Sequence, residues 1–273
     1  MLTLFFSASM TTGKTASFEI RGPMRLSPFI KYYGSKWRLA PLYPPPQGQI
    51  IIEPFCGSAQ YATLYPNRDV RLYDLDEKLM GAWDFLITAT EREILSLPLM
   101  LSPGEHIDDY SIPEEAKWLI GYWISVTAWP KPVRSAASWH SLQTGRYLST
   151  WSRAKRADLA ASVEHIRHWK ICLADYREAP DVEATWFIDP PYQNKGGQHY
   201  RKSSSELNYM EISDWVKSRK GLRIVCEGQG ADWLDFKVLR NHKGTDRSAE
   251  YQELVWTDYI DPQLNLFETH SNG

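Results

Sequence analysis

The sequence predicts an α/β protein built on a doubly wound sheet with helices on both faces. Short apolar runs alternate with helical apolar spacing over residues 49–88 and again over residues 170–258. Three of the predicted strands end in a carboxylate, at Glu53, Asp74 and Asp189. Such sheets bind ligands at the carboxyl ends of their strands, although acids in these positions also occur as helix caps.

In the first part of the chain, strands and helices follow one another at short spacing. Residues 50–53 are expected to form a buried strand, and the small residues at 54–58 a turn. Residues 59–65 are expected to form the next helix, and residues 70–74 a second strand. Residues 77–87 have apolar side chains at helical spacing, which predicts an amphipathic helix.

The second part resumes this alternation after a long interval. Residues 89–169 are helical in character and rich in Trp and Tyr, which predicts a helical region inserted into the sheet domain. After it, strands are predicted at residues 170–175, 184–188, 222–227, 236–239 and 253–256, with a helix at 211–218. Alternating strands and helices favour a mostly parallel sheet.

Length and composition narrow the class of protein. The 273 residues, 43% of them hydrophobic, suit one domain with an insertion, between a disordered extension at 1–24 and a tail at 261–273. The net charge of −2 gives no overall sign of nucleic-acid binding. Cys56, Cys172 and Cys226 lack the spacing of metal ligands, which predicts buried thiols in a reducing cytoplasm and no metal. No apolar stretch reaches transmembrane length, so no membrane partner is expected.

The tetrapeptide Asp189-Pro190-Pro191-Tyr192 is the most informative motif. Two prolines directly after a strand end it, because proline fixes φ and lacks a backbone N–H. A flat ligand with an exocyclic amino group suits the result. Its two hydrogens can be donated to Asp189 and to a proline carbonyl, while Tyr192 covers the face of the ring. The alternative is a strand that simply ends in a Pro-Pro turn.

Small residues follow the first predicted strand, in the sequence Glu53-Pro54-Phe55-Cys56-Gly57-Ser58-Ala59. They would let the backbone pass close to a ligand, but neither the dinucleotide spacing of glycines nor a Walker loop is present. Asp74, about 20 residues further on, could accept hydrogen bonds from a ribose diol. Together these features predict a nucleoside cofactor with a positively charged tail rather than a pyrophosphate.

A basic stretch lies near the end of the helical region. Residues 131–170 contain eight basic and two acidic side chains, interleaved with Trp, Tyr and His. Clustered positive charge with aromatic residues is typical of a nucleic-acid surface, and the alternative is a solvated helix face with Trp in the core. The candidate DNA-binding residues are Lys131, Arg134, Arg146, Arg153, Lys155 and Arg156.

In this order, the motifs resemble those of the Dam-type N6-adenine DNA methyltransferases, which use S-adenosylmethionine. The corresponding segments are Phe-Ile-Lys-Tyr-Tyr-Gly-Ser-Lys at 29–36 for K-W-x-G-G-K, residues 53–57 for E-P-F-x-G, residues 73–76 for the acidic second-strand motif, residues 189–192 for D-P-P-Y, and residues 253–255 for the last strand. The resemblance covers residues 28–90 and 170–258, and not the middle of the chain. The family usually has Gly where Ser35 and Ala59 stand.

The resemblance implies a Rossmann-like class I methyltransferase sheet with an inserted helical target-recognition region. Residues 25–88 and 170–260 would form the catalytic domain, and residues 89–169 the DNA-recognition region. The cofactor would be S-adenosylmethionine, the partner double-stranded DNA, and the target adenine would be flipped into the pocket. A solitary phage or prophage enzyme in the bacterial cytoplasm is consistent with this.

The resemblance also implies roles for individual residues. The cofactor would lie across Tyr32, Lys36, Glu53, Phe55, Gly57 and Asp74, with Asp175 near its adenine. The catalytic residues would be Asp189, Pro190, Pro191 and Tyr192. Two alternatives stay open, namely methylation of another amino acceptor (cytosine N4 or RNA adenine) and a DNA-binding relative without catalytic activity.

Overall fold

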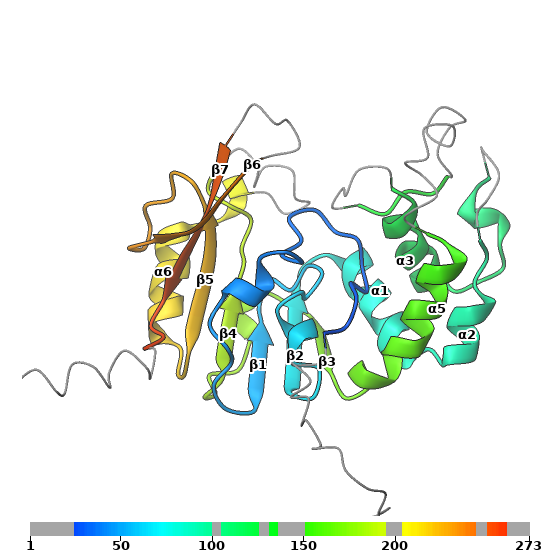
Figure 1. Cartoon of the computed structure of the whole chain (residues 1–273), viewed down its shortest axis with the longest axis horizontal. Helices are drawn as coiled ribbons and strands as arrows, with labels where there is room; N and C mark the ends of the chain where they lie inside the picture. The colour runs from blue at the N-terminus through cyan, green and yellow to red at the C-terminus, as the bar shows by residue number, and fades with distance from the viewer. Residues whose placement is uncertain are drawn as a thin grey trace, which may run out of the picture.

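The computed structural model describes residues 25–99, 105–125, 131–135, 151–194, 204–243 and 250–260. These residues form a seven-stranded sheet with helices packed against it, so the predicted α/β class is confirmed (Figure 1). The strands are β1 (Ile50–Glu53), β2 (Asp69–Asp74), β3 (Lys170–Leu173), β4 (Thr185–Ile188), β5 (Arg223–Gly228), β6 (Lys237–Lys243) and β7 (Glu250–Thr257). Each predicted strand is present, with its ends shifted by a few residues at most in β1 to β5.

The sheet is mixed and has the strand order β3-β2-β1-β4-β5-β7-β6. The pairs β1–β2, β2–β3, β1–β4 and β4–β5 are parallel, whereas β7 runs antiparallel between β5 and β6. The first five strands thus follow the order of a doubly wound nucleotide-binding sheet. The order reverses between β1 and β4, and ligands of such sheets bind at this switch point.

Five α-helices accompany the sheet in the described part of the chain: α1 (Glu77–Thr88), α2 (Glu91–Ser96), α3 (Glu114–Ile124), α5 (Arg153–Ser162) and α6 (Tyr209–Ser218). The predicted helices at 77–87 and 211–218 are confirmed as α1 and α6. Helices α2, α3 and α5 come from residues 89–169, whose predicted helical character is confirmed where the structure describes them. They gather with α1 beside β3, at the opposite end of the sheet from α6 (Figure 1).

Local sequence signals set the ends of these helices. Asp76 caps α1, because its Oδ1 accepts the backbone N–H of Lys78 at 3.0 Å. Thr90 and Glu93 form a reciprocal capping box at the start of α2. Arg167 closes the other end of α1 by donating to the carbonyls of Ile87 (2.8 Å) and Ala89 (2.5 Å).

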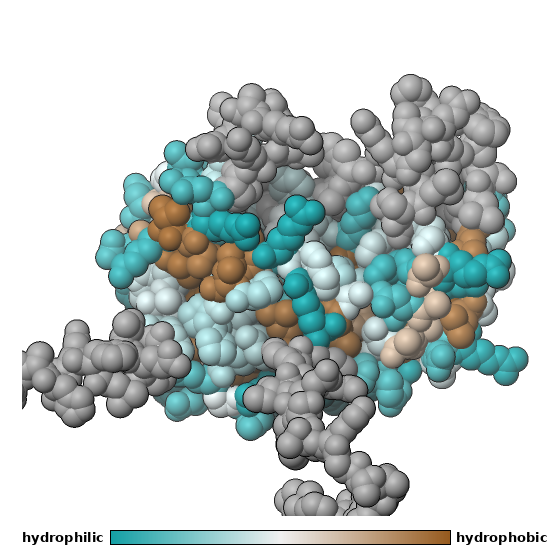
Figure 2. Space-filling model, in the orientation of Figure 1, coloured by the Kyte–Doolittle hydropathy of each residue, from teal (hydrophilic) through white to brown (hydrophobic). Residues whose placement is uncertain are grey.

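Apolar side chains are buried on both faces of the sheet. One cluster joins the sheet to α1, α3 and α5 through residues such as Leu79, Trp83 and Leu119. The other joins it to α6 through Trp186 and Val216. Figure 2 shows a hydrophobic area over β6 and β7, the part of the sheet furthest from α1. No helix in the described ranges is both long enough and apolar enough to cross a membrane.

The helix predicted at residues 59–65 is wrong. This segment forms tight turns followed by a single 3-10 turn, Ala62–Leu64. Ala59 has a φ of +46°, which a right-handed helix does not allow. The carboxyl of Glu53 accepts the N–H of Ala62 at 2.8 Å, so a side chain from β1 replaces a helical hydrogen bond.

The three cysteines are free thiols. Cys56 and Cys226 are buried, as predicted, but Cys172 on β3 is only partly buried. The predicted disordered extension at 1–24 and the predicted tail at 261–273 lie outside the described residues.

Candidate active site

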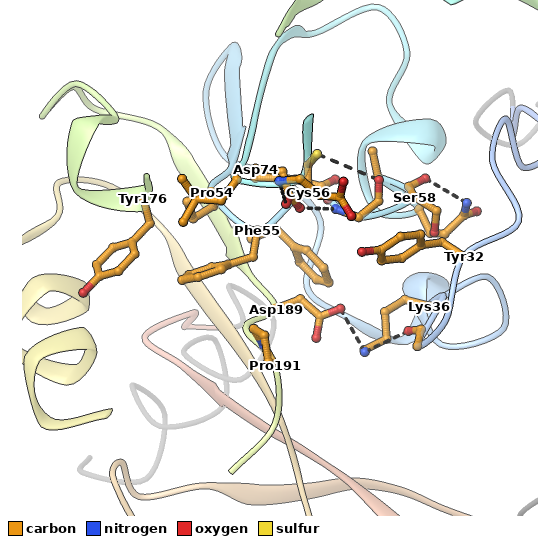
Figure 3. Close-up of a pocket in the computed structure, with 18 of the residues that line it drawn as sticks. Tyr32, Lys36, Pro54, Phe55, Cys56, Ser58, Asp74, Tyr176, Asp189 and Pro191 are labelled. Atoms are coloured by element: carbon orange, nitrogen blue, oxygen red, sulfur yellow. Dashed lines mark hydrogen bonds and ion pairs between the residues drawn. The ribbon is translucent and has the colours of Figure 1, made fainter. Parts of the chain in front are cut away.

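A pocket opens at the switch point, where β1, β2 and β4 end (Figure 3). Its volume is about 880 Å³ when its open mouth is included. Every residue assigned to the cofactor lines it, namely Tyr32, Lys36, Glu53, Phe55, Gly57, Asp74 and Asp175. Asp189 and Pro191 of the D-P-P-Y motif line it as well. Five segments that are separate in the sequence therefore meet at one cavity.

The turn after β1 forms one wall of the pocket. Gly57 and Ala59 both have left-handed backbone conformations, with φ of +45° and +46°. A Cβ at Gly57 would lie 3.3 Å from the ring of Tyr32, so glycine allows this ring to approach the backbone. The Gly57 carbonyl accepts a hydrogen bond from Trp83 Nε1 at 2.9 Å. Helix α1 thus holds the turn in its unusual shape.

Glu53 lies beneath this turn and is only 2% exposed. Burial raises the pKa of its carboxyl to about 8, although the hydrogen bond from the Ala62 N–H opposes the shift. At neutral pH this acid is mainly protonated. It can therefore donate a hydrogen bond as well as accept one.

Asp74 ties together the turns after β1 and β2. Its Oδ2 accepts the Gly57 N–H at 3.3 Å, and its Oδ1 accepts the Asp76 N–H at 3.0 Å. Burial raises its pKa to about 6, and the two backbone hydrogen bonds oppose the shift. A carboxylate has about four lone-pair positions, so these contacts leave it capacity for a ligand hydroxyl.

An aromatic pair lies at the other side of the pocket. The rings of Phe55 and Tyr176 are stacked, with centroids 5.2 Å apart (Figure 3). Asp175 precedes Tyr176 and accepts the backbone N–H and the Nε of Arg177 at 3.0 and 2.7 Å. Burial raises the pKa of Asp175, but the hydrogen bonds from Arg177 outweigh it and lower the pKa overall. A flat apolar surface next to an ionised acid suits a purine with an amino group.

The carboxylate of Asp189 faces the ammonium of Lys36, with Oδ2 2.9 Å from Nζ (Figure 3). Burial raises the pKa of Asp189 to about 6, and the nearby Lys36 opposes the shift. Lys36 is 6% exposed and lies 4.7 Å from the centre of the Tyr192 ring. Pro190 is buried, and the Pro191 carbonyl accepts a hydrogen bond from the Tyr209 hydroxyl at 2.6 Å.

The charge of the pocket is unbalanced. The lining residues include five acids, Glu53, Asp74, Asp76, Asp175 and Asp189, and one base, Lys36. Even with Glu53 mainly protonated and Asp189 paired with Lys36, the other three acids favour a cationic ligand and disfavour a pyrophosphate. The described residues contain no group of three or more His, Cys, Asp or Glu side chains that could hold a metal ion.

The candidate DNA-binding residues differ in whether their side chains are exposed or bind partners within the protein. Lys131 and Arg153 are exposed. Arg134 pairs with Asp108 and Glu114, Lys155 lies 2.6 Å from Asp158, and Arg156 donates to the Leu97 carbonyl. Arg146 lies outside the described residues.

The described tryptophans of the basic stretch are buried in the protein. Trp151 and Trp169 are buried and donate to the carbonyls of Pro98 (2.9 Å) and Pro66 (3.1 Å). These two rings therefore belong to the core rather than to a nucleic-acid surface.

Sequence reasoning missed three residues at or near the site. Tyr176 lines the pocket next to Asp175, which was predicted to bind the cofactor. An aromatic side chain beside a predicted site residue is the signal that could have identified it. Tyr43 and Glu253 are buried next to the D-P-P-Y motif, where the Tyr192 hydroxyl donates to Glu253 Oε1 at 2.6 Å. Glu253 was expected only as part of the last strand. No local pattern links it to Tyr192, which is 61 residues away.

No family model matches the chain, and a search of curated proteins also finds no match.

Proposed function

We propose that the chain transfers a methyl group from S-adenosylmethionine to the N6 amino group of adenine in DNA, on a Rossmann-like methyltransferase sheet. One observation carries the proposal. The turn after β1 and the acid that ends β2 line the same cavity as Asp189 at the end of β4. A cofactor site and an amine-binding site thus share one pocket at the switch point, where a doubly wound sheet binds its ligands.

The residues of the pocket fit this cofactor. S-adenosylmethionine, when bound, supplies an electrophilic methyl group on a positively charged sulfur. Asp74 would accept from its ribose hydroxyls, and Phe55, Tyr176 and Asp175 would bind its adenine. The excess of acids over bases among the lining residues favours its net positive charge.

Asp189 is suited to bind an amino group, because it already binds one. The Lys36 ammonium donates to its carboxylate across 2.9 Å, the distance of a charge-assisted hydrogen bond. The Pro191 carbonyl is engaged by Tyr209, so we assign the second amino hydrogen of the target base to the Pro190 carbonyl. Two acceptors in fixed positions orient the nitrogen lone pair, and orientation supplies much of the rate enhancement in such sites.

The proton balance also involves Asp189. The amino nitrogen gains a methyl group and must lose one proton. A carboxylate with a pKa of about 6 is mainly ionised at pH 7 but accepts a proton more readily than an ordinary aspartate. Asp189 can therefore take this proton and then release it to water.

The experiment that tests the proposal has two measurements. Calorimetry should show that the full-length chain binds S-adenosylmethionine. Incubation with duplex DNA and cofactor labelled in the methyl group should then yield N6-methyladenine, identified after digestion to nucleosides. Asp189→Ala should lower the transfer rate by at least about a hundredfold, because it removes one of the two groups that orient the amine. Cofactor affinity should stay close to that of the wild type.

Asp181→Ala is a matched control, since Asp181 precedes the same strand at its opposite end and pairs with Arg219 and Lys220. It should keep the wild-type transfer rate. If the labelled product is N4-methylcytosine, the substrate is cytosine rather than adenine. If only RNA is labelled, the substrate is RNA rather than DNA. Absence of cofactor binding would reject the proposal.

A further inference from the structure

Glu253 is a buried carboxylate next to the catalytic motif, and the proposed chemistry does not use it. It lies on β7 and is 4% exposed. Its Oε1 accepts the hydroxyls of Tyr192 at 2.6 Å and Tyr43 at 2.7 Å. The same oxygen lies 3.8 Å from Lys36 Nζ. Burying a carboxylate costs desolvation free energy, and the three donors around this one oxygen offset that cost.

β5, which pairs with β7, leaves room for the ring of Tyr192. Glu253 pairs with Gly228 of β5 in the sheet register. A Cβ at Gly228 would lie 2.8 Å from Tyr192 Cδ2, a distance that real side chains avoid. Gly228 therefore leaves room for the ring, and Glu253 fixes its hydroxyl. Two paired positions of the sheet thus hold both ends of one tyrosine.

Lys36 connects this arrangement to the amine-binding site. Its ammonium is shared unequally between Asp189, at 2.9 Å, and Glu253, at 3.8 Å. When a substrate amine donates to Asp189, Lys36 must give up part of this contact. Glu253 then supplies a second carboxylate, so the buried ammonium does not lose its counter-charge.

We propose that Glu253 is a positioning residue that holds the Tyr192 ring and the Lys36 ammonium beside Asp189. This inference rests on the proposed function, because the object that it positions is the binding site for the target amine. β7 thereby contributes to the site although none of its residues lines the pocket in the described part of the chain. Glu253 acts through Tyr192 and Lys36 and does not touch the substrate.

The two tyrosine hydroxyls on Glu253 allow a matched comparison. Tyr192→Phe and Tyr43→Phe each remove one hydroxyl from the same carboxylate oxygen, but only Tyr192 belongs to the D-P-P-Y motif, with its ring centre 4.7 Å from Lys36 Nζ. Tyr192→Phe should lower kcat for methyl transfer about tenfold, because a loosely held ring misplaces the base. Tyr43→Phe should keep kcat within about twofold of the wild type, as its hydroxyl is remote from the amine.

Glu253→Gln keeps an acceptor oxygen but removes the negative charge that faces Lys36. We expect a loss in kcat of about 10- to 100-fold, the range for small misplacements in an active site. KM for S-adenosylmethionine should change little. The double variant Tyr192→Phe with Glu253→Gln should be no slower than Glu253→Gln alone, since both changes disturb the same contact.

Two results would overturn the inference. One is a wild-type kcat for Glu253→Gln, and the other is an equal loss of kcat in Tyr43→Phe and Tyr192→Phe. The second result would make Glu253 a stabilising residue of the core and no more. Melting temperatures measured on all variants identify any that lose activity by unfolding.

A measurement without substrate separates this inference from the proposed function. In protein labelled with 3-fluorotyrosine, the fluorine NMR signal of Tyr192 is identified by its loss in Tyr192→Phe. If Glu253 holds this ring, Glu253→Gln should shift and broaden that signal even if the wild type transfers no methyl group. An unchanged Tyr192 signal would refute the positioning role, whatever the substrate.

Discussion

The pKa values of Glu53 and Asp74 in the pocket are shifted in the opposite direction from that of Glu93 in the helical segment at residues 89–169. In the pocket, burial raises the pKa of Glu53 to about 8 and of Asp74 to about 6. In the helical segment, hydrogen bonds from Thr90 lower the pKa of Glu93. The ionised forms of Glu53 and Asp74 are therefore destabilised by burial, whereas the ionised form of Glu93 is stabilised by its hydrogen bonds.

The backbone shows the same contrast. Ala59 in the pocket wall is the only described residue other than glycine with a positive φ. In the helical segment, Thr90 and Glu93 form a regular capping box, and basic side chains such as Lys155 and Arg156 bind partners within the protein. Strain and perturbed pKa values that concentrate in one cavity are typical of a binding or catalytic site. The helical segment has the features of a stabilising unit.

The largest effect on ligand binding is expected for Asp74. Asp74→Ala should weaken S-adenosylmethionine binding by about 1–3 kcal/mol, because it removes a charged acceptor from the pocket. Calorimetry on the folded variant measures this. Asp69→Ala is the matched control, since Asp69 begins the same strand at the end away from the pocket. An equal affinity in both variants would assign Asp74 a structural role only.

Stability should depend on pH in opposite ways in the two regions. The folded-state pKa of Glu53, about 8, lies above the ordinary glutamate value of 4.5, so the folded protein retains a proton that the unfolded chain releases. This contribution to stability is complete below pH 4.5 and is lost as the pH rises through 8. Glu53→Gln does not titrate but keeps an oxygen for the Ala62 N–H. Its stability relative to the wild type should therefore rise by about 4 kcal/mol between pH 5 and 8.5, since each pH unit below the folded-state pKa contributes about 1.4 kcal/mol.

Glu93→Gln provides the comparison in the helical segment. The pKa of Glu93 is lowered, so its contribution to stability is present above the ordinary glutamate pKa of 4.5 and is lost only as the pH falls through the folded-state pKa. The difference between this variant and the wild type should stay constant between pH 5 and 8.5. Thermal unfolding of the three proteins at both pH values checks both expectations. Parallel pH profiles for Glu53→Gln and the wild type would contradict the raised pKa.

A smaller effect is expected from the backbone of the pocket wall. Ala59→Gly should raise the free energy of unfolding by about 1 kcal/mol or slightly less, because glycine adopts a positive φ without the steric cost that alanine has. Ala62→Gly, in the adjoining 3-10 turn, should lower stability instead. Denaturant titrations of the two variants measure the difference. A loss of stability in both would show that Ala59 is not strained.

The smallest effects are expected for the basic residues of the helical segment. Lys131→Ala and Arg153→Ala should each lower the salt slope of DNA binding by about 1, because these side chains are exposed and available to phosphates. Lys155→Ala and Arg156→Ala should instead lower the melting temperature, since both side chains bind partners within the protein. Wild-type slopes for both exposed variants would place the DNA-binding surface elsewhere.

The α/β class, the strands and the helices α1 and α6 follow from the sequence alone. Period-2 and helical apolar patterns identified β2, α1 and α6, because each pattern depends only on which face of a local element is buried. The sequence also brought Glu53, Asp74 and Asp189 to one edge of the sheet. Parallel strands fix that edge whatever the details of packing.

The tertiary structure alone decided the shape of the pocket wall and the partners of its buried charges. The segment after Gly57 has helical propensity, but a hydrogen bond from Ala62 to Glu53 and the φ of Ala59 replace the helix with turns. Lys36 and Glu253 reach Asp189 and Tyr192 from opposite ends of the chain. Such contacts are set by side-chain packing between distant segments, and no local pattern encodes them.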